Sequence, residues 1–375
     1  MSKLPHISTS IFSIMSQLAN EHNAINLSQG FPNFPVDSLL KERAAFWSKQ
    51  EIHQYLPMAG YPPLLEKIAQ LTKDSYQRII DPNTNIIITA GATEGIFATI
   101  QALVMPNEEV IILDPSYDCY ETPILLCNAI PKRINLNDDF TPNWELIGNT
   151  VNSKTRMIII NNPHNPTGTT WKEHDFIALE KLTESNPNLI ILSDEVYEYI
   201  TFENKHQSIN QREKLKEKSI AISSFGKSFH ITGWKIGYIV AAEDLMKEIK
   251  KVHQFLVFSV NSIAQYAIND YLDSAKIHEL GWFYQQKRDF FRSLLKETKF
   301  ELLPCEGSYF QIANYSKITN ENDLEFAKKL VTQFGVATIP LSPFYADHKQ
   351  TNCLRFCFAK EEETLVSATE KLLKL

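Results

Sequence analysis

Five short runs of consecutive apolar residues recur through the middle of this chain, and they constrain its fold more than any other feature. They lie at residues 85–90, 110–113, 157–160, 189–192 and 220–222. Continuous apolar strands of this length are typical of a mostly parallel sheet whose two faces are both covered. A helical pattern follows the first run at residues 96–104. We therefore expect an α/β fold with a mostly parallel central sheet flanked by helices.

Each run leads into small or polar residues, and these ends carry the candidate functional side chains. They are the Gly91 loop, Tyr117, Asn165, Asp194 and Lys227. Ligands bind in open α/β sheets at the carboxyl ends of the strands, so we expect these five ends to meet at one edge. Any one of them could be ordinary loop chemistry. Five at one edge predict a binding site.

The pattern changes after about residue 245 and indicates a second, smaller domain. Helical spacing covers residues 245–255, 262–272 and 284–295, and strand candidates follow at 308–313, 336–339 and 353–358 before a final helix. A further helix is expected at 10–21, with Thr9 or Ser10 as its N-cap. We assign residues 1–45 to an N-terminal arm, 46–280 to a large domain, and 281–375 to a C-terminal segment that packs with the arm as a smaller α+β domain.

Composition excludes several classes of protein. The 375 residues are 43% hydrophobic and 22% charged, with a formal net charge of −7, which argues against disorder and against a nucleic-acid surface. The first residues lack the apolar core of a signal peptide, and no apolar run is long enough to cross a bilayer. The five cysteines contain no CxxC pair, so we expect no zinc or other metal, reduced thiols and a cytoplasmic location.

Two familiar nucleotide-binding motifs are excluded by their spacing. The segment Gly226-Lys227-Ser228 resembles the end of a phosphate-binding P-loop, but Ala221 stands where the first glycine of that motif belongs. The helix that must follow is also interrupted at Gly233. No GxGxxG segment occurs, so a Rossmann dinucleotide site has no support.

The segment Gly91-Ala92-Thr93 lies between a predicted strand and a predicted helix, where a phosphate group is often bound. Small residues let backbone N–H groups approach the phosphate oxygens, and the helix N-terminus supplies positive potential. Ser224 and Lys235 could add a hydroxyl and a cation to the same phosphate. On its own such a turn most often only connects two elements.

An acid and a lysine at the ends of two buried strands suggest a site built around a charged, carbonyl-bearing cofactor. Asp194 alone could be a helix cap, but a buried carboxylate beside a pyridine nitrogen would hold that nitrogen protonated. Tyr197 and Asn165 could bond the phenolic oxygen of such a ring. Tyr117 could stack on its face, although a core tyrosine is an equally good interpretation of this residue taken alone.

Arg355 lies within a period-2 strand pattern at residues 353–358. A guanidinium among apolar neighbours usually pairs with a carboxylate through two parallel hydrogen bonds. Its partner could be internal, or it could be the α-carboxylate of a substrate.

Together these residues resemble the pyridoxal-phosphate aminotransferases of class I, which have the fold-type I architecture. The resemblance covers nearly the whole chain and is closest to the branch of the methionine, kynurenine and glutamine aminotransferases. Its most specific motifs are Asn162-Pro163-His164-Asn165-Pro166-Thr167-Gly168, Asp194-Glu195-Val196-Tyr197 and Ser224-Phe225-Gly226-Lys227. The resemblance implies an amino-group transfer from an amino acid to a 2-oxo acid, with pyridoxal 5'-phosphate as the cofactor.

The resemblance also implies the roles of individual residues. Lys227 would carry the cofactor as a Schiff base and act with Asp194 and Tyr197 in catalysis. The remaining cofactor contacts would come from Gly91, Ala92, Thr93, Tyr117, Asn165, Ser224 and Lys235, and from Tyr55 of a partner subunit in a homodimer. The substrate carboxylate would bind Arg355, Asn165 and the Gly30 backbone.

Two departures and several alternatives concern the substrate. Most of the class carries arginine where Lys235 stands, and a lysine gives the phosphate a single point charge in place of a bidentate clamp. Kynurenine-preferring relatives carry histidine where Ser259 stands, so a methionine-like or aromatic donor is favoured over kynurenine. Candidates for the apolar side-chain pocket, with core packing as the rival interpretation, are Phe12, Phe31, Tyr61 and Phe258. The alternative functions are a kynurenine or glutamine aminotransferase, a cysteine-S-conjugate β-lyase, and a catalytically silent binding protein.

Overall fold

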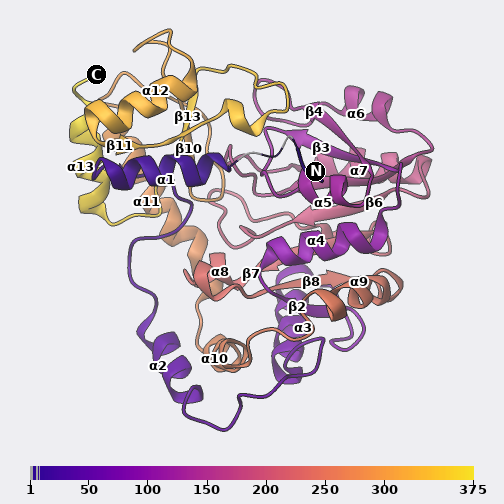
Figure 1. Cartoon of the computed structure of the whole chain (residues 1–375). Coiled ribbons are helices and arrows are strands. Elements are labelled where there is room, and N and C mark those ends of the chain that lie inside the picture. The colour runs from indigo at the N-terminus through magenta and orange to yellow at the C-terminus, as the bar shows by residue number, and fades with distance from the viewer. Residues whose placement is uncertain (1–2, 6, 8) are drawn as a thin grey trace.

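A computed structural model describes residues 3–5, 7 and 9–375 of the chain. Its centre is a seven-stranded sheet in the order β2-β8-β7-β6-β5-β3-β4 (Figure 1). The strands are β2 (Ile86–Thr89), β3 (Glu109–Asp114), β4 (Ile130–Asn135), β5 (Thr155–Asn161), β6 (Ile190–Asp194), β7 (Ser219–Ser224) and β8 (Gly237–Ala241). Only β8 runs antiparallel to its neighbours, so the expected mostly parallel α/β fold is confirmed.

The central strands are apolar along their whole length because helices cover both faces of the sheet. Successive side chains of a strand point to opposite faces. In β2, Ile86 and Ile88 pack into one core while Ile87 packs into the other, and the same alternation continues in β3 and β5. The two cores therefore explain why the apolar runs of the sequence do not alternate with polar residues.

Helices accompany this sheet in the large part of the molecule. They include α3 (Pro62–Tyr76), α4 (Ala92–Leu103), α5 (Glu121–Leu126), α6 (Trp144–Thr150), α7 (Glu173–Ser185), α9 (Glu243–Leu256) and α10 (Ser262–Leu272). The helix expected at 96–104 in fact begins at Ala92, because Gly91 adopts a φ of 77° as its N-cap and lets the chain turn directly from β2 into the helix. The N-terminus of α4 is thereby brought to the end of the sheet.

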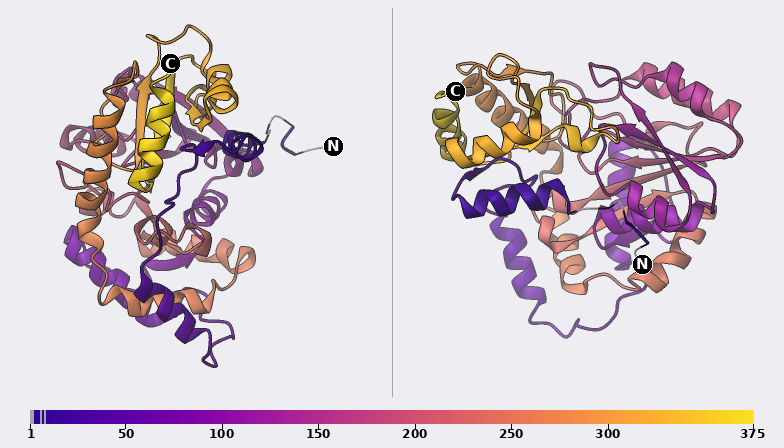
Figure 2. Two further views of the ribbon diagram at one scale, coloured as in Figure 1. Left: turned by 90° about the vertical axis from the view of Figure 1, so that its left-hand side faces the viewer. Right: turned by 45° about the horizontal axis from the view of Figure 1, so that its top comes forward.

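The N-terminal arm and the C-terminal segment form a second group of elements. They are α1 (Ile11–Glu21), β1 (Ile25–Asn26), α11 (Leu280–Leu295), β9 (Glu301–Leu302), β10 (Phe310–Asn314), α12 (Asp323–Lys329), β11 (Val336–Ala337), β12 (Ile339–Pro340), β13 (Cys353–Cys357) and α13 (Glu362–Leu372). Strand β1 pairs in parallel with β11, and β12, β13, β10 and β9 form an antiparallel sheet. Figures 1 and 2 show the indigo α1 lying among the orange and yellow C-terminal elements.

Helix α1 begins where the sequence indicates. The Ser10 hydroxyl accepts a hydrogen bond from Phe12 N at 3.2 Å and serves as its N-cap. Helix α2 (Ser38–Trp47), in contrast, packs against α10 of the large part, with Trp47 Nε1 donating to Asp270 Oδ2 at 2.8 Å. We therefore propose that the N-terminal arm ends near residue 37 rather than at residue 45, since α2 packs on a helix of the large part.

Within the described residues, no helix combines the length and the hydropathy of a membrane span. Across the same residues, histidine, cysteine, aspartate and glutamate side chains nowhere gather in a group of three that could hold a metal ion.

Candidate active site

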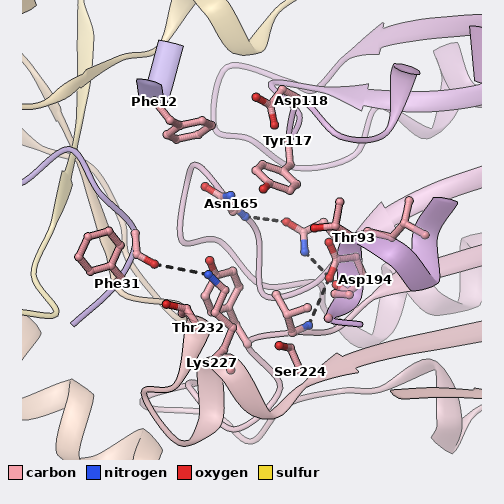
Figure 3. A pocket seen from close by; sticks show the side chains of 18 of the residues that line it. Phe12, Phe31, Thr93, Tyr117, Asp118, Asn165, Asp194, Ser224, Lys227 and Thr232 are labelled. Carbon is pink, nitrogen blue, oxygen red and sulfur yellow. Dashed lines mark hydrogen bonds between the residues drawn. The ribbon is translucent and has the colours of Figure 1, made fainter. Parts of the chain in front are cut away.

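A cavity of about 360 Å³ opens at the carboxyl ends of the central strands (Figure 3). The five strand ends singled out in the sequence all line it, namely those that carry Gly91, Tyr117, Asn165, Asp194 and Lys227. Elements of both parts of the molecule form its walls, because Phe12 and Gly30 come from the N-terminal arm and Arg355 from β13. The cavity therefore lies between the central sheet and the smaller group of elements.

Asp194 is the last residue of β6 and is almost completely buried at 4% exposure. Its Oδ2 accepts a hydrogen bond from the Tyr120 hydroxyl at 2.7 Å, and its Oδ1 accepts one from Val196 N at 3.3 Å. Burial raises the pKa of Asp194 from 3.8 to about 6, although both hydrogen bonds favour the ionised form. The site thus holds an oriented carboxylate whose pKa is raised toward neutral pH.

Lys227 lies in α8 (Phe225–Ser228), a single helical turn that follows β7 directly. Its Nζ is 3.4 Å from the carbonyl oxygen of Gly30 and lies over the rings of Tyr197 and Tyr309, at 5.6 and 5.8 Å from their centroids. Burial lowers the pKa of Lys227 from 10.5 to about 8. A substantial fraction of this amine is therefore unprotonated at mildly alkaline pH.

A turn with room for an anion forms one end of the cavity. Gly91, Ala92 and Thr93 line it at the N-terminus of α4, where unpaired backbone N–H groups and the helix dipole favour negative charge. A Cβ atom at Gly91 would lie 3.0 Å from Lys235 Nζ, so this ammonium lies directly against the turn. Lys235 forms no ion pair with any carboxylate of the residues described here.

Strand β8 passes unusually close to the same turn. A Cβ atom on Gly237 would lie 2.8 Å from Ser223 O and 2.9 Å from Ala92 N, distances that no real side chain adopts. The glycine therefore allows β8 to close against the turn, and Ser224 lines the cavity beside it. Small residues, a helix N-terminus, a hydroxyl and an unpaired cation together fit a phosphate group.

Arg355 also lines the cavity and is 1% exposed. Its Nη1 donates to Asn165 Oδ1 at 2.8 Å and its Nη2 donates to Ser28 O at 2.7 Å. Its Nε has no hydrogen-bond partner, and no carboxylate of the described chain pairs with the guanidinium. Because a buried charge is normally paired, an unpaired arginine that lines a cavity fits an anionic ligand.

Aromatic rings complete the walls. The guanidinium of Arg355 lies 3.9 Å from the ring centroid of Phe310 and 5.0 Å from that of Phe12. Tyr117 also faces the cavity, with its ring centroid 6.2 Å from that of Phe12 (Figure 3). Tyr197 is 3% exposed, and burial raises the pKa of its hydroxyl. The tyrosine therefore stays protonated and able to donate a hydrogen bond.

The structure brings most, but not all, of the predicted residues to the cavity. Phe31 lines it. Tyr61 does not, because its ring packs on Tyr266 at 4.1 Å between centroids. Tyr55 and Phe258 lie outside the cavity of their own chain as an edge-to-face pair 5.2 Å apart, with exposures of 81% and 43%.

Sequence reasoning missed several residues that the structure places at the site. Tyr120 and Asn161 both hold Asp194 in place, since the Tyr120 hydroxyl donates to its Oδ2 at 2.7 Å and Asn161 Nδ2 donates to its main-chain O at 2.8 Å. Further unassigned residues that line the cavity are Ser10, Gln29, Ile96, Asp118, Val196, Gly226, Thr232 and Phe310. The position of Asn161 at the end of an apolar run was a usable signal, while nothing distinguished Tyr120 from a core tyrosine.

Comparison with known proteins agrees with this geometry. A family profile described as aminotransferase class I and II matches residues 22–372. A methionine aminotransferase from Escherichia coli (strain K12) is 46% identical, with 100% of this chain and 98% of the relative covered. A kynurenine–oxoglutarate transaminase from Dictyostelium discoideum is 32% identical, with 98% and 94% covered. A solved structure from Escherichia coli, described as having a methionine aminotransferase function, superposes with a TM-score of 0.97 at 45% identity, covering 100% of this chain and 99% of that one. The chain therefore belongs to the aminotransferase class I and II family.

Proposed function

We propose that this aminotransferase uses pyridoxal 5'-phosphate, held at Lys227, to move the amino group of a methionine-like amino acid to a 2-oxo acid. The observation that carries the proposal is that one cavity brings together all the groups that such a cofactor and its substrate need. The turn at Gly91 with Lys235, the Lys227 amine, the Asp194 carboxylate and the unpaired Arg355 all line it.

The residues present fit this cofactor from end to end. The turn at Gly91, Ala92 and Thr93, together with Ser224 and Lys235, would hold the phosphate. Asp194 would pair with the pyridine nitrogen, and Tyr197 and Asn165 would bond the phenolic oxygen while Tyr117 packs on the ring. The bound cofactor supplies an electron-withdrawing ring that makes the α-proton of the amino acid acidic.

Lys227 would then move that proton. Its pKa of about 8 leaves part of the amine unprotonated near neutral pH, which is the state a general base needs. Such proton transfer typically accelerates a reaction by ~10²–10⁴. The buried Asp194 acts as a fixed charge beside the ring, since Tyr120 and Val196 already orient its two oxygens.

Arg355, Asn165 and the Gly30 backbone would bind the substrate carboxylate. Asn165 and Ser28 fix the plane of the guanidinium and leave its Nε unbonded. A bound carboxylate would supply the missing negative charge for this buried cation. Amino acids and 2-oxo acids share this carboxylate, so one site serves both half-reactions.

The preference for methionine rests on the relatives and on the cavity wall. The Escherichia coli relative is named for methionine, and Phe12, Phe31 and Phe310 give this cavity an aromatic lining. Thioether groups make favourable contacts with aromatic rings. The similarity to a kynurenine–oxoglutarate transaminase supports kynurenine as the second candidate donor.

We also propose a cytoplasmic homodimer. Tyr55 and Phe258 stand exposed as a pair on the surface, and they would complete the cavity of the partner, with Tyr55 bonding the phosphate. The five cysteines form no disulfide, which favours a reducing compartment.

Reduction with borohydride tests the central proposal. We expect it to fix a pyridoxyl group on Lys227, located by peptide mass spectrometry, and we expect Lys227→Ala to lose both the adduct and turnover. Lys287→Ala is the matched control, since Lys287 lies outside this cavity. An adduct elsewhere, or full turnover by Lys227→Ala, would disprove the assignment.

A panel of amino donors and 2-oxo acids tests the substrate. We expect the highest kcat/KM with methionine and lower values with kynurenine and glutamine. Release of pyruvate from a cysteine conjugate without an oxo acid would instead indicate the β-lyase reaction. A protein that binds the cofactor but turns over no donor would support the silent alternative.

A further inference from the structure

We propose that Glu94 and His253 are positioning residues that hold the phosphate-binding turn in its anion-binding shape. The inference rests on the proposed function, because it assigns the turn at residues 90–93 to the cofactor phosphate. Neither residue lines the cavity, so both act through the backbone of the turn rather than on the ligand.

Glu94 lies in the first turn of α4, and its side chain folds back across the start of the helix. Its Oε2 accepts a hydrogen bond from Ala90 N at 3.1 Å. Ala90 precedes Gly91, whose N–H donates to Thr89 O at 2.7 Å. Two hydrogen bonds thus fix the chain on the near side of the turn, and the N–H groups that follow are left for the cavity.

The other carboxylate oxygen is held from a separate helix. Glu94 Oε1 lies 3.0 Å from His253 Nδ1, and His253 belongs to α9, which packs against α4 (Figure 1). The His253 side chain is fully buried and that of Glu94 is 9% exposed. The imidazole therefore donates from Nδ1 to a carboxylate that cannot turn to solvent.

The pair resolves a conflict at the N-terminus of α4. A carboxylate in the first helical turn stabilises the helix but competes electrostatically with an anionic ligand at the same place. With Oε1 bonded to the imidazole and Oε2 to Ala90 N, both oxygens of Glu94 are directed away from the N–H groups that face the ligand. Loss of either bond would free the carboxylate to bond those same N–H groups.

Four variants separate this role from a general structural one. Glu94→Ala removes the acceptor for Ala90 N, and His253→Leu removes the donor to Glu94. Glu94→Gln keeps an oxygen acceptor, and His253→Asn places an amide N–H where Nδ1 stands. Asp175→Ala is the matched control, because Asp175 folds back onto Lys172 N at 2.8 Å in the first turn of α7, away from the cavity.

The measurement is the affinity of full-length apoprotein for pyridoxal 5'-phosphate and for pyridoxal, which lacks the phosphate, with inorganic phosphate as competitor. We expect Glu94→Ala and His253→Leu to weaken binding of the phosphorylated form about tenfold relative to pyridoxal. Glu94→Gln and His253→Asn should stay within about twofold of wild type. Asp175→Ala should lower the melting temperature and leave the affinity ratio unchanged.

An unchanged ratio in Glu94→Ala and His253→Leu overturns the proposal, as does an equal loss in Asp175→Ala. If His253→Leu does not fold, the comparison of Glu94→Ala with Glu94→Gln decides. Failure of the proposed function looks different: the wild-type apoprotein itself would then show no preference for the phosphorylated form and no competition by phosphate.

Discussion

The hydroxyl of Tyr120 donates a hydrogen bond to Oδ2 of Asp194 at 2.7 Å, from behind the cavity that Asp194 lines. Tyr120 is itself 3% exposed, so the bond is shielded from water. Hydrogen bonds to an ionised group in a buried site are stronger than neutral ones, and this bond opposes the effect of burial on the carboxyl. Tyr120 therefore helps to keep Asp194 ionised at neutral pH.

Replacing Tyr120 by phenylalanine should shift the pH dependence of catalysis. The pKa of Asp194 is raised to about 6 by burial while the Tyr120 bond lowers it, so loss of the bond raises the pKa further. We expect kcat/KM of Tyr120→Phe to fall about tenfold near pH 6.5 and less near pH 8.5. Tyr76→Phe, which removes a hydroxyl from the buried Glu198, is the control and should not move the profile. A parallel loss at both pH values would contradict the prediction.

The free energy of unfolding of the apoprotein should also depend on pH through the titration of Asp194. Its folded pKa of about 6 lies above the ordinary aspartate value of 3.8, so the folded state binds this proton more tightly than the unfolded state does. The contribution is fully present below about pH 4 and is lost as pH rises through 6, at a cost of about 3 kcal/mol.

Asp194→Asn removes that titration. We expect urea unfolding at pH 7.5 to show the variant apoprotein more stable than wild type by ~1–3 kcal/mol, with the difference disappearing near pH 4. Equal stability of the two proteins at both pH values would show that Asp194 is not penalised by burial.

The buried guanidinium of Arg355 should be irreplaceable by lysine. A lysine is a single point charge and cannot donate to Asn165, to Ser28 O and to a substrate carboxylate in fixed directions. We expect Arg355→Lys to raise KM for the amino donor tenfold or more and to change kcat less, measured by steady-state kinetics. Arg288→Lys is the control, because Arg288 is also buried but already pairs with Glu203. An unchanged KM in Arg355→Lys would remove this residue from substrate binding.

A methyl group at Gly237 should separate β8 from the turn at residues 91–93, which we propose binds the cofactor phosphate. The added Cβ would lie 2.8 Å from Ser223 O and 2.9 Å from Ala92 N, and both contacts are with backbone that cannot rotate away. We expect Gly237→Ala to destabilise the protein by ~1–3 kcal/mol and to weaken cofactor binding. Gly233→Ala is the control, because a Cβ atom added at Gly233 would meet no atom within 4 Å. We expect this variant to behave like wild type in urea unfolding and in cofactor titration. Similar behaviour of the two variants would contradict the close approach.

Much of the central sheet could be predicted because a strand buried on both faces consists of consecutive apolar residues, a pattern that is visible in the sequence. The isoleucines of β2, β3 and β5 form short continuous runs because they pack alternately into the cores on the two faces of the sheet. The antiparallel direction of β8 could not be predicted, since Gly237–Ala241 is as apolar as its parallel neighbours. Strand direction depends on the connections between strands, which the composition of a strand does not encode.

The candidate site was predictable where a residue ends a strand and unpredictable where it acts from a neighbouring element. Asp194, Lys227 and Asn165 mark strand ends and were expected to meet. Tyr61 was expected at the cavity, but packing on Tyr266 holds its ring elsewhere. The pairing of Glu94 with His253 joins residues 159 positions apart, and only the packing of α4 on α9 brings them together.

Two carbonyl groups of the short segment after β1 contact two different side chains that line the cavity. Ser28 O receives Arg355, while Gly30 O receives the Tyr309 hydroxyl at 2.6 Å and lies against Lys227. A shift of this three-residue stretch would therefore displace the guanidinium and the amine at once. Grafting the leading segment of a relative onto this chain would therefore change the surroundings of Arg355 and Lys227 together. Under the roles proposed for these residues, carboxylate binding and proton transfer could not be altered separately through that segment.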